Sequence, residues 1–416
     1  MRGRDLLLLA ALAFSLRAFA IWAVPLAAQA ERIECAPDEA GHFWVANEWA
    51  HGRAPTWPES SWTIKGSFPP TQYAAQAATV ALTRVGLDPD WLYRFPIQVD
   101  AVRGYPMARF GSALLGVATV LLLACAAWIW TGSSAAGRAV GLMAAVYPQL
   151  IFIGSYSNGD AMTVFAGAVV AWGLARWVRA GEGEHGLAWV GIGSALVLMG
   201  KPTGFGILPA NGFWLFWAWW RGRIGVRAIC VATLSGLVVC GPLLAWNAWR
   251  NGGDPLGLWL YGDYVKTAYE ARAGDVIPNA EGTFAYLFPA SAFGVFRNVD
   301  LPLPMPLLAA ALVLLVVGLV RATSSLTGAE PATRRGAAWL AASVVITVSL
   351  AAWNAWFVDF QPQGRYALLC AILLTAVAVC GPQGARFERG WLRLYLGFLA
   401  VCALWTEWIL YANPCA

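Results

Sequence analysis

Residues 107–130, MARFGSALLGVATVLLLACAAWIW, form an apolar run interrupted by a single charged residue, Arg109. About 20 apolar residues suffice for an α-helix to cross the hydrocarbon core of a bilayer. Similar runs recur along the chain, whose 416 residues are 59% hydrophobic and 12% charged, whereas soluble domains are about 25% charged. The sequence therefore predicts an all-α polytopic membrane protein, because the strands of a β-barrel would give alternating patterns instead of continuous runs.

The apolar runs predict about eleven membrane spans in a single transmembrane domain, residues 1–416. With eleven crossings, the loop arginines fall on one side of the membrane, which the positive-inside rule assigns to the cytoplasm together with the N-terminus. The expected spans are 5–29, 107–130, 137–154, 160–178, 187–200, 204–220, 225–247, 303–321, 337–357, 365–381 and 392–411.

The first run leaves two interpretations open. Arg2 and Arg4, the apolar run and the small residues Ala28-Gln29-Ala30 resemble a signal peptide with a cleavage site. Arg17 inside the run, and the length of the run, favour a retained helix instead. An intramembrane arginine needs a polar partner, which the sequence does not name.

Two long loops are expected outside the cytoplasm, at 30–106 and 248–302. The first loop should contain an amphipathic helix at about 38–52, too polar to cross the membrane. A second short helix should start after Phe68-Pro69-Pro70, because proline suits the first turn of a helix. Tyr73, Ala77 and Val80 would line its apolar side.

The first loop opens with Pro37-Asp38-Glu39-Ala40-Gly41-His42-Phe43. Asp38, Glu39 and His42 share one face of a helix at these spacings. They could act as a general base with a supporting carboxylate, or hold a divalent metal such as magnesium or manganese. The alternative is that Asp38 merely caps the helix. Glu48 and His51 repeat the spacing of Glu39 and His42 but point elsewhere on the helix, so we expect them at the surface.

Further polar residues are expected at the same outer edge of the membrane. An arginine or a lysine there can bind a phosphate. The simpler alternatives are that Asp160 stabilises a helix start, Lys201 extends to the interface and Arg365 pairs with Asp359. The candidate phosphate ligands are Lys201 and Arg365, and the supporting residues are Asp160, Tyr366, Arg103 and Arg109.

Two of the eight cysteines, Cys35 and Cys415, lie in segments expected outside the cytoplasm. An oxidising compartment would allow a disulfide between them. Two free thiols are the alternative, since a disulfide requires the two Cα atoms to come within about 7 Å.

Several short motifs resemble those of the GT-C superfamily of membrane glycosyltransferases, which includes protein O-mannosyltransferases and the aminoarabinose transferase of lipid A. The sequence is most similar to a bacterial branch of predicted membrane proteins of unknown function. Phe68 stands where family members often have histidine, and the soluble C-terminal domain of larger relatives has no counterpart. The motifs occur in the expected order: Pro37-Asp38-Glu39 with His42, Phe68-Pro69-Pro70-Thr71-Gln72-Tyr73, Ser157-Asn158-Gly159-Asp160, Lys201-Pro202-Thr203, Ser291-Ala292-Phe293-Gly294-Val295-Phe296 and Gln363-Gly364-Arg365-Tyr366.

The resemblance implies a helical bundle, with interfacial helices in the first outer loop, in a bacterial inner membrane. It implies transfer of a sugar from a polyprenyl phosphate to an extracytoplasmic glycan, lipid or protein, with inversion and with Asp38 or Glu39 as the base. Membrane lipids are partners and nucleic acid is not. The competing hypotheses are a transporter or flippase of a lipid-linked saccharide, which would bind near mid-bilayer, and a non-catalytic subunit of cell-envelope assembly.

Overall fold

The computed structural model describes residues 1–23, 39–55, 63–82, 104–179, 183–269, 286, 288, 290–296, 301–326, 330–357 and 386–412. The predictions for Asp38, Arg103, Arg365, Tyr366, Cys35 and Cys415, and for the span 365–381, lie outside the described residues.

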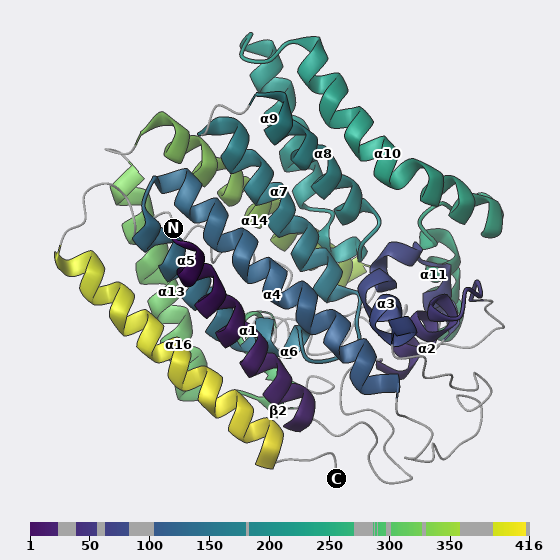
Figure 1. The fold of residues 1–416 in the computed structure, drawn as a ribbon, viewed down its shortest axis with the longest axis horizontal. Coiled ribbons are helices and arrows are strands. Elements are labelled where there is room, and N and C mark those ends of the chain that lie inside the picture. Colours follow the sequence, from purple (N-terminus) through teal and green to yellow (C-terminus); the bar gives the residue numbers. More distant parts are fainter. Residues whose placement is uncertain are drawn as a thin grey trace.

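The described chain folds into a bundle of long helices with shorter helices packed at one end (Figure 1). Each expected span other than 365–381 overlaps helix in the described residues, and positions 24–29 of the first expected span lie outside them. The bundle helices are α1 (Gly3–Ala23), α4 (Gly104–Thr131), α5 (Ser134–Val146), α6 (Pro148–Ile153), α7 (Asp160–Val178), α8 (Glu184–Leu198), α9 (Ile207–Trp220), α10 (Val226–Arg250), α13 (Met305–Leu326), α14 (Pro331–Phe357) and α16 (Arg386–Ala412).

The expected span 137–154 differs from the prediction, because it is two helices, α5 and α6. Tyr147 lies between them with an extended backbone, and Pro148 is the first residue of α6. Proline disfavours a helical conformation of the residue before it and lacks the N–H that a continuous helix needs. A new helix, α6, therefore starts at Pro148, and it ends at Ile153, directly before the candidate site.

Five helices among the described residues are long and apolar enough to cross a membrane, so the chain is a multi-pass membrane protein. The total of about eleven spans stays a prediction. The five helical ranges are Gly3–Ala23, Met107–Thr131, Asp160–Val178, Val226–Arg250 and Gly390–Ala412.

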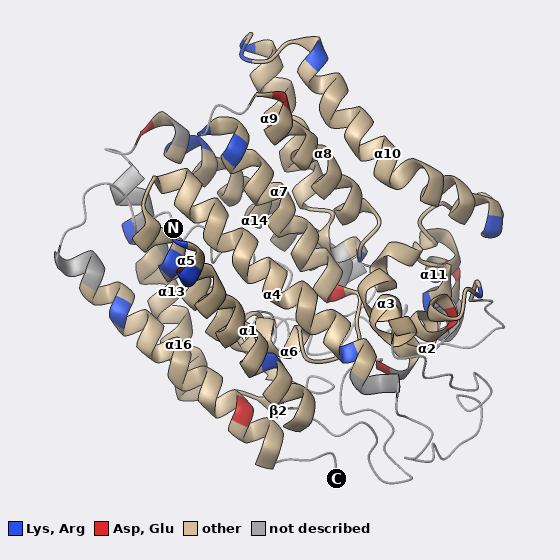
Figure 2. Ribbon diagram, in the orientation of Figure 1, with Lys and Arg blue, Asp and Glu red and all other residues tan. Residues whose placement is uncertain are grey.

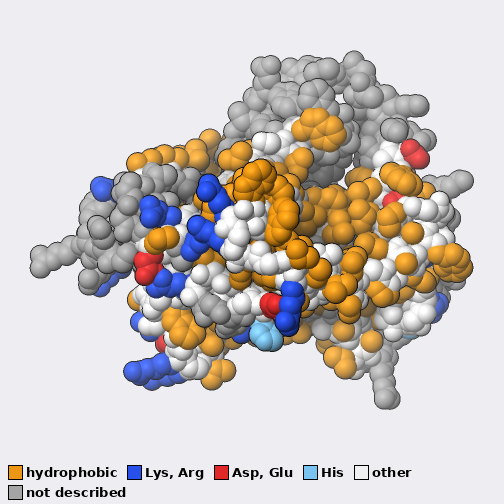
Figure 3. Space-filling model, turned by 90° about the horizontal axis from the view of Figure 1, so that it is seen from above, with side chains coloured by type: hydrophobic (Ala, Val, Ile, Leu, Met, Phe, Trp, Pro, Cys, Tyr) orange, Lys and Arg blue, Asp and Glu red, His pale blue; other side chains and the backbone are white. Residues whose placement is uncertain are grey.

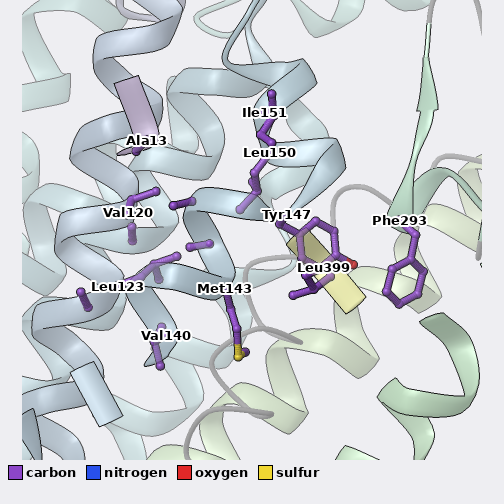
Figure 4. Packing of buried hydrophobic residues seen from close by; sticks show 14 of the residues in the cluster. Ala13, Val120, Leu123, Val140, Met143, Tyr147, Leu150, Ile151, Phe293 and Leu399 are labelled. Carbon is purple, nitrogen blue, oxygen red and sulfur yellow. The ribbon is translucent and has the colours of Figure 1, made fainter. Parts of the chain in front are cut away.

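The core lies where α1, α4, α5 and α6 meet, with α16 against them (Figure 4). Ala13 of α1, Leu123 of α4 and Met143 of α5 are almost fully buried there. Small residues let these helices approach closely, as is usual between membrane helices. At Gly141 a Cβ would lie 2.5 Å from Leu9 Cδ1 of α1, so a larger residue would require the Leu9 side chain to shift.

One end of the bundle carries the arginine-rich turns, near the N-terminus and the α9–α10 turn (Figure 2). Ion pairs join these turns: Arg138 to Asp5 at 3.3 Å, Arg227 to Glu184 at 3.0 Å, and Arg179 to Glu330. Seen from above, basic side chains lie beside a broad hydrophobic surface (Figure 3). The turns thus share one end, as the positive-inside pattern requires; which side of the membrane this end faces stays a prediction.

The opposite end carries the short elements of the first loop. These are α2 (Glu39–Ala50), η1 (Thr63–Ser67), η2 (Pro70–Tyr73) and α3 (Ala74–Leu82), with α11 (Leu258–Tyr269) from the second loop. A small antiparallel pair, β1 (Val295–Phe296) and β2 (Leu301–Pro302), places Val295 opposite Pro302 and Phe296 opposite Leu301.

Helix α2 forms where expected, but it does not have the exposed polar face of an interfacial helix. All residues from 41 to 48 are buried, because α3, α4, η1 and η2 pack around it. The second predicted helix is confirmed as η2 followed by α3, with Tyr73, Ala77 and Val80 buried. The first loop therefore contains a packed cap on the bundle, and buried polar groups of α2 need partners inside the protein.

Candidate functional site

The candidate site lies at the end of the bundle opposite the arginine-rich turns. Three pieces of chain meet there: the start of α2, the η2–α3 segment, and residues 154–159 between α6 and α7, called here the α6–α7 loop. Asp160, the first residue of α7, follows that loop directly. The turn that contains Lys201 packs beside α7.

Glu39, at the start of α2, is held by a buried ion pair. Arg109 of α4 donates from Nε to Oε1 at 2.7 Å and from Nη2 to Oε2 at 2.5 Å. The backbone N–H of Ser157 donates to the same Oε1 at 2.9 Å. Both side chains are almost completely buried, at 0% exposure for Arg109 and 4% for Glu39. Charge-assisted bidentate bonds of this kind are strong and directional.

The consequence for chemistry is that Glu39 is a structural anchor, because both of its carboxylate oxygens already accept hydrogen bonds. Arg109 also donates to the Ile21 carbonyl at the end of α1, at 3.4 Å. One arginine thereby joins α1, α4 and α2, and Glu39 extends that connection to the α6–α7 loop. The start of α2 is fixed in place, immediately after Asp38 in the sequence.

His42 lies one turn further along α2 and contacts Tyr73 at the end of η2. The distance from His42 Nδ1 to Tyr73 Oη is 2.9 Å, and both residues are buried. Glu39 and His42, although on one face of α2, therefore have different partners. No group of three His, Cys, Asp or Glu side chains able to hold a metal occurs within the described part of the chain; Asp38, the third predicted ligand, lies outside that part.

Asp160 and Lys201 form a second ion pair. The distances from Lys201 Nζ to the two Asp160 oxygens are 3.2 and 3.4 Å. Asp160 is buried at the N-terminus of α7, where the helix dipole favours a negative charge, and 24% of the Lys201 side chain is exposed. The Lys201 backbone N–H donates to Thr163 Oγ1 at 2.8 Å. The lysine therefore reaches an acidic partner within the protein, instead of only extending to the interface.

The α6–α7 loop is rigid because side-chain amides bond to its backbone. Asn158 donates to the carbonyls of Ile153 and Tyr156 and accepts from the Ala161 N–H. Gln76 of α3 donates to the Asn158 carbonyl at 2.9 Å and to Ser112 of α4 at 3.1 Å. Gln76 was not singled out in the sequence; its only signal was a polar residue on the apolar side of a short helix.

The C-terminal end of α10 also holds the first loop. Arg250 is the last residue of α10, and its guanidinium lies 4.8 Å from the ring centre of Trp246 and 5.6 Å from that of Trp49 on α2. It donates to the Gly66 carbonyl at 2.5 Å. Cation–π contacts and hydrogen bonds from one side chain thus join α10, α2 and η1. This arginine was missed because nothing in its local sequence distinguishes it from an interfacial residue.

Glu48 was predicted to be a surface residue, and this is wrong. It is 7% exposed, and Arg53 donates to both of its carboxylate oxygens at 2.7 and 2.9 Å. The reason is that α2 is covered on all sides, so a carboxylate there needs a cation. His51 is exposed, as predicted. The distance from its Nδ1 to the Asn47 carbonyl oxygen is 2.8 Å.

No protein-family model and no curated protein matches this sequence. Solved structures do resemble the fold. The oligosaccharyltransferase of Archaeoglobus fulgidus tethered with an acceptor peptide containing the NVT sequon has a TM-score of 0.53 and 12% identity, over 99% of this chain and 55% of that chain. AglB from the same organism, in complex with an inhibitory peptide and a dolichol-phosphate, has a TM-score of 0.51 and 12% identity, with the same coverage.

The Saccharomyces cerevisiae protein O-mannosyltransferase Pmt1-Pmt2 complex, bound to the sugar donor, also matches. Its TM-score is 0.43 and its identity 17%, over 73% of this chain and 38% of that chain. The two oligosaccharyltransferase structures, with TM-scores above 0.5, confirm for the fold the resemblance predicted from the motifs. The chain spans about half the length of the oligosaccharyltransferases, 55%.

Proposed function

We propose that the protein is a membrane glycosyltransferase that moves a sugar from a polyprenyl phosphate to an acceptor outside the cytoplasm. The observation that carries this proposal is the pairing of Glu39 with Arg109 and of Asp160 with Lys201 around one loop. Acid and base groups meet there at one end of an apolar bundle, where a lipid-borne phosphate and a polar acceptor can both reach. The GT-C fold supports the same activity, although fold alone does not establish it.

The base in this proposal is Asp38, with Glu39 as its anchor. A general base must be able to take the acceptor proton, and Glu39 is poorly suited because it is buried and already accepts three hydrogen bonds, from Arg109 and from the Ser157 N–H. Protonating Glu39 would also leave the buried Arg109 charge without its partner. Asp38 directly precedes Glu39 in the sequence and is the other carboxylate of the motif.

The reaction then follows from these roles. The Asp38 carboxylate takes the proton of an acceptor hydroxyl, and the oxygen attacks the anomeric carbon from the face opposite the phosphate. The bond from carbon to the phosphate oxygen breaks, and the polyprenyl phosphate leaves with the electron pair. A single displacement of this kind inverts the anomeric configuration.

Lys201 and Arg365 are the proposed ligands of the donor phosphate. Lys201 is suited to this because Asp160 holds its ammonium at the site while part of the side chain remains exposed. Because the lysine side chain is already held in place, it loses little conformational entropy when it binds the phosphate. Arg365 would add a planar fork that fits phosphate oxygens.

The test is to incubate the purified protein in lipid nanodiscs with polyprenyl-phosphate mannose, glucose, galactose and arabinose and measure released polyprenyl phosphate. The proposal expects release from at least one donor. Release should be faster with a crude extracytoplasmic acceptor fraction and at least about 100-fold slower with Asp38→Asn. Movement of the donor across a proteoliposome membrane without any release would contradict transfer and support the flippase alternative.

A further inference from the structure

Arg17, in the middle of α1, is the most deeply buried charge outside the candidate site. It is 1% exposed. Its Nη1 donates to the Ala13 carbonyl on its own helix at 2.9 Å, and its Nη2 donates to the Leu150 carbonyl of α6 at 3.2 Å. A charge at this depth in a membrane bundle is costly, so it is retained for a reason.

Two glycines make room for this side chain. A Cβ on Gly154 would lie 2.6 Å from Arg17 Nε, and one on Gly116 of α4 would come still closer. The same glycines line a small cavity with Arg17 and Thr119, and Arg17 Nε has no hydrogen-bond partner among the residues that the structure describes. Both neighbouring helices are thus shaped around the guanidinium.

Helix α16 runs alongside α1 (Figure 1) and carries an acidic residue, Glu407. Glu407 is 6% exposed, and among the described residues neither of its carboxylate oxygens has a hydrogen-bond partner. In a medium of low dielectric opposite charges attract over a longer distance than in water, so a negative charge on Glu407 would offset part of the Arg17 charge.

Arg17 bonds to α6 just before the α6–α7 loop begins. Leu150 lies in the last turn of α6, and its carbonyl accepts from the Gly154 N–H at 3.2 Å as well as from Arg17. Gly154, which packs on the guanidinium, is the first residue of the loop. Three residues later, the Ser157 N–H donates to Glu39, and Asp160 then begins α7.

We propose that Arg17, with Glu407 as its counter-charge, is a positioning residue that supports the α6–α7 loop from inside the bundle. Arg109 and Gln76 hold the loop from the outer side, through Glu39 and through the Asn158 carbonyl. Arg17 holds the turn from which the loop departs. The pair fixes where Ser157 and Asp160 lie, without touching a substrate.

Hydrogen–deuterium exchange of the loop tests this proposal without reference to any activity. The main variant is Arg17→Met with Glu407→Leu, because apolar residues of similar volume often replace a buried ion pair without loss of stability. The expected result is exchange in residues 154–161 at least about tenfold faster than in the wild type, which corresponds to about 1.4 kcal/mol of local opening. Peptides from α8 and α9 should keep their wild-type rates.

The matched control is Asn211→Leu, which breaks a different buried contact. Asn211 of α9 donates to Ser194 at 2.9 Å and accepts from the Trp339 N–H at 2.8 Å. This control should speed exchange in α8, α9 and α14 and leave residues 154–161 unchanged. It separates a local effect on the loop from a general loss of stability.

If the double variant does not fold, the conservative variant Arg17→Lys provides the test. Lysine keeps the charge beside Glu407 but cannot hold both carbonyls in the same planar geometry, so the loop should exchange at an intermediate rate. The proposal is overturned if the folded double variant, or Arg17→Lys, keeps wild-type exchange in residues 154–161. Acceleration by the same factor in every helix would also overturn it, because the pair would then be merely structural.

Discussion

Both ends of the bundle contain ion pairs, but the pairs differ in how deeply they are buried. At the candidate site Arg109 and Glu39 are 0% and 4% exposed, whereas at the opposite end Arg227 and Glu184 are 85% and 38% exposed. An exposed pair contributes little, because water and salt screen it. A buried pair fixes geometry, and breaking it leaves an uncompensated charge. The comparison teaches that only one end uses its charges to hold a precise arrangement of chain segments.

The largest effect should come from Arg109→Met. This change leaves the Glu39 carboxylate buried without its cation, and removing one partner of a buried pair costs about 3–5 kcal/mol. Denaturant unfolding in detergent, followed by tryptophan fluorescence, measures the loss. A loss below about 1 kcal/mol would show that the site pair behaves like an exposed one, and the contrast between the two ends would fail.

Asp160→Asn should have the next largest effect. The substitution removes the counter-charge of Lys201 while keeping the shape, and hydrogen bonds to charged groups contribute about 1.5–3 kcal/mol. We expect a loss within that range, together with weaker binding of polyprenyl phosphate measured by thermophoresis. The matched variant Lys201→Gln should weaken the same binding. Wild-type affinity in both variants would show that Asp160 and Lys201 do not take part in binding the phosphate.

Tyr73→Phe should be milder. It removes the hydroxyl that contacts His42 Nδ1 at 2.9 Å and retains the ring in its buried position. The expected loss is about 1 kcal/mol, the usual net value of a neutral hydrogen bond. The same unfolding assay measures it. A loss of unfolding free energy larger than that of Asp160→Asn would contradict the expected order of the two pairs.

Arg227→Ala, at the opposite end, should have the smallest effect. The expected change in unfolding free energy is below about 1 kcal/mol, and it should shrink further in 0.5 M salt, where exposed charges are screened. Sugar transfer should stay at the wild-type rate. A loss comparable to that of Arg109→Met would contradict the distinction drawn between the ends.

The positions of the helices could be predicted from the sequence, because apolar runs such as 107–130 and the Pro70 helix start depend on local pattern. The pairing within the site could not. Glu39 and Arg109 are 70 residues apart in sequence, and Asp160 and Lys201 are 41 apart, so neither pair leaves a local signal. The burial of Glu48 was missed for the same reason, since the elements that cover α2 come from other parts of the chain.

The central claim, that Asp38 is the base and Glu39 its anchor, is tested most directly by comparing Asp38→Asn with Glu39→Gln. Release of polyprenyl phosphate and unfolding free energy are measured on the same preparations. Asp38→Asn should slow release by at least about 100-fold, the lower range for losing a general base, while its stability stays at the wild-type value. Glu39→Gln should lower stability as well as activity, because it weakens the bonds to Arg109 and Ser157. Wild-type release by Asp38→Asn would contradict the account.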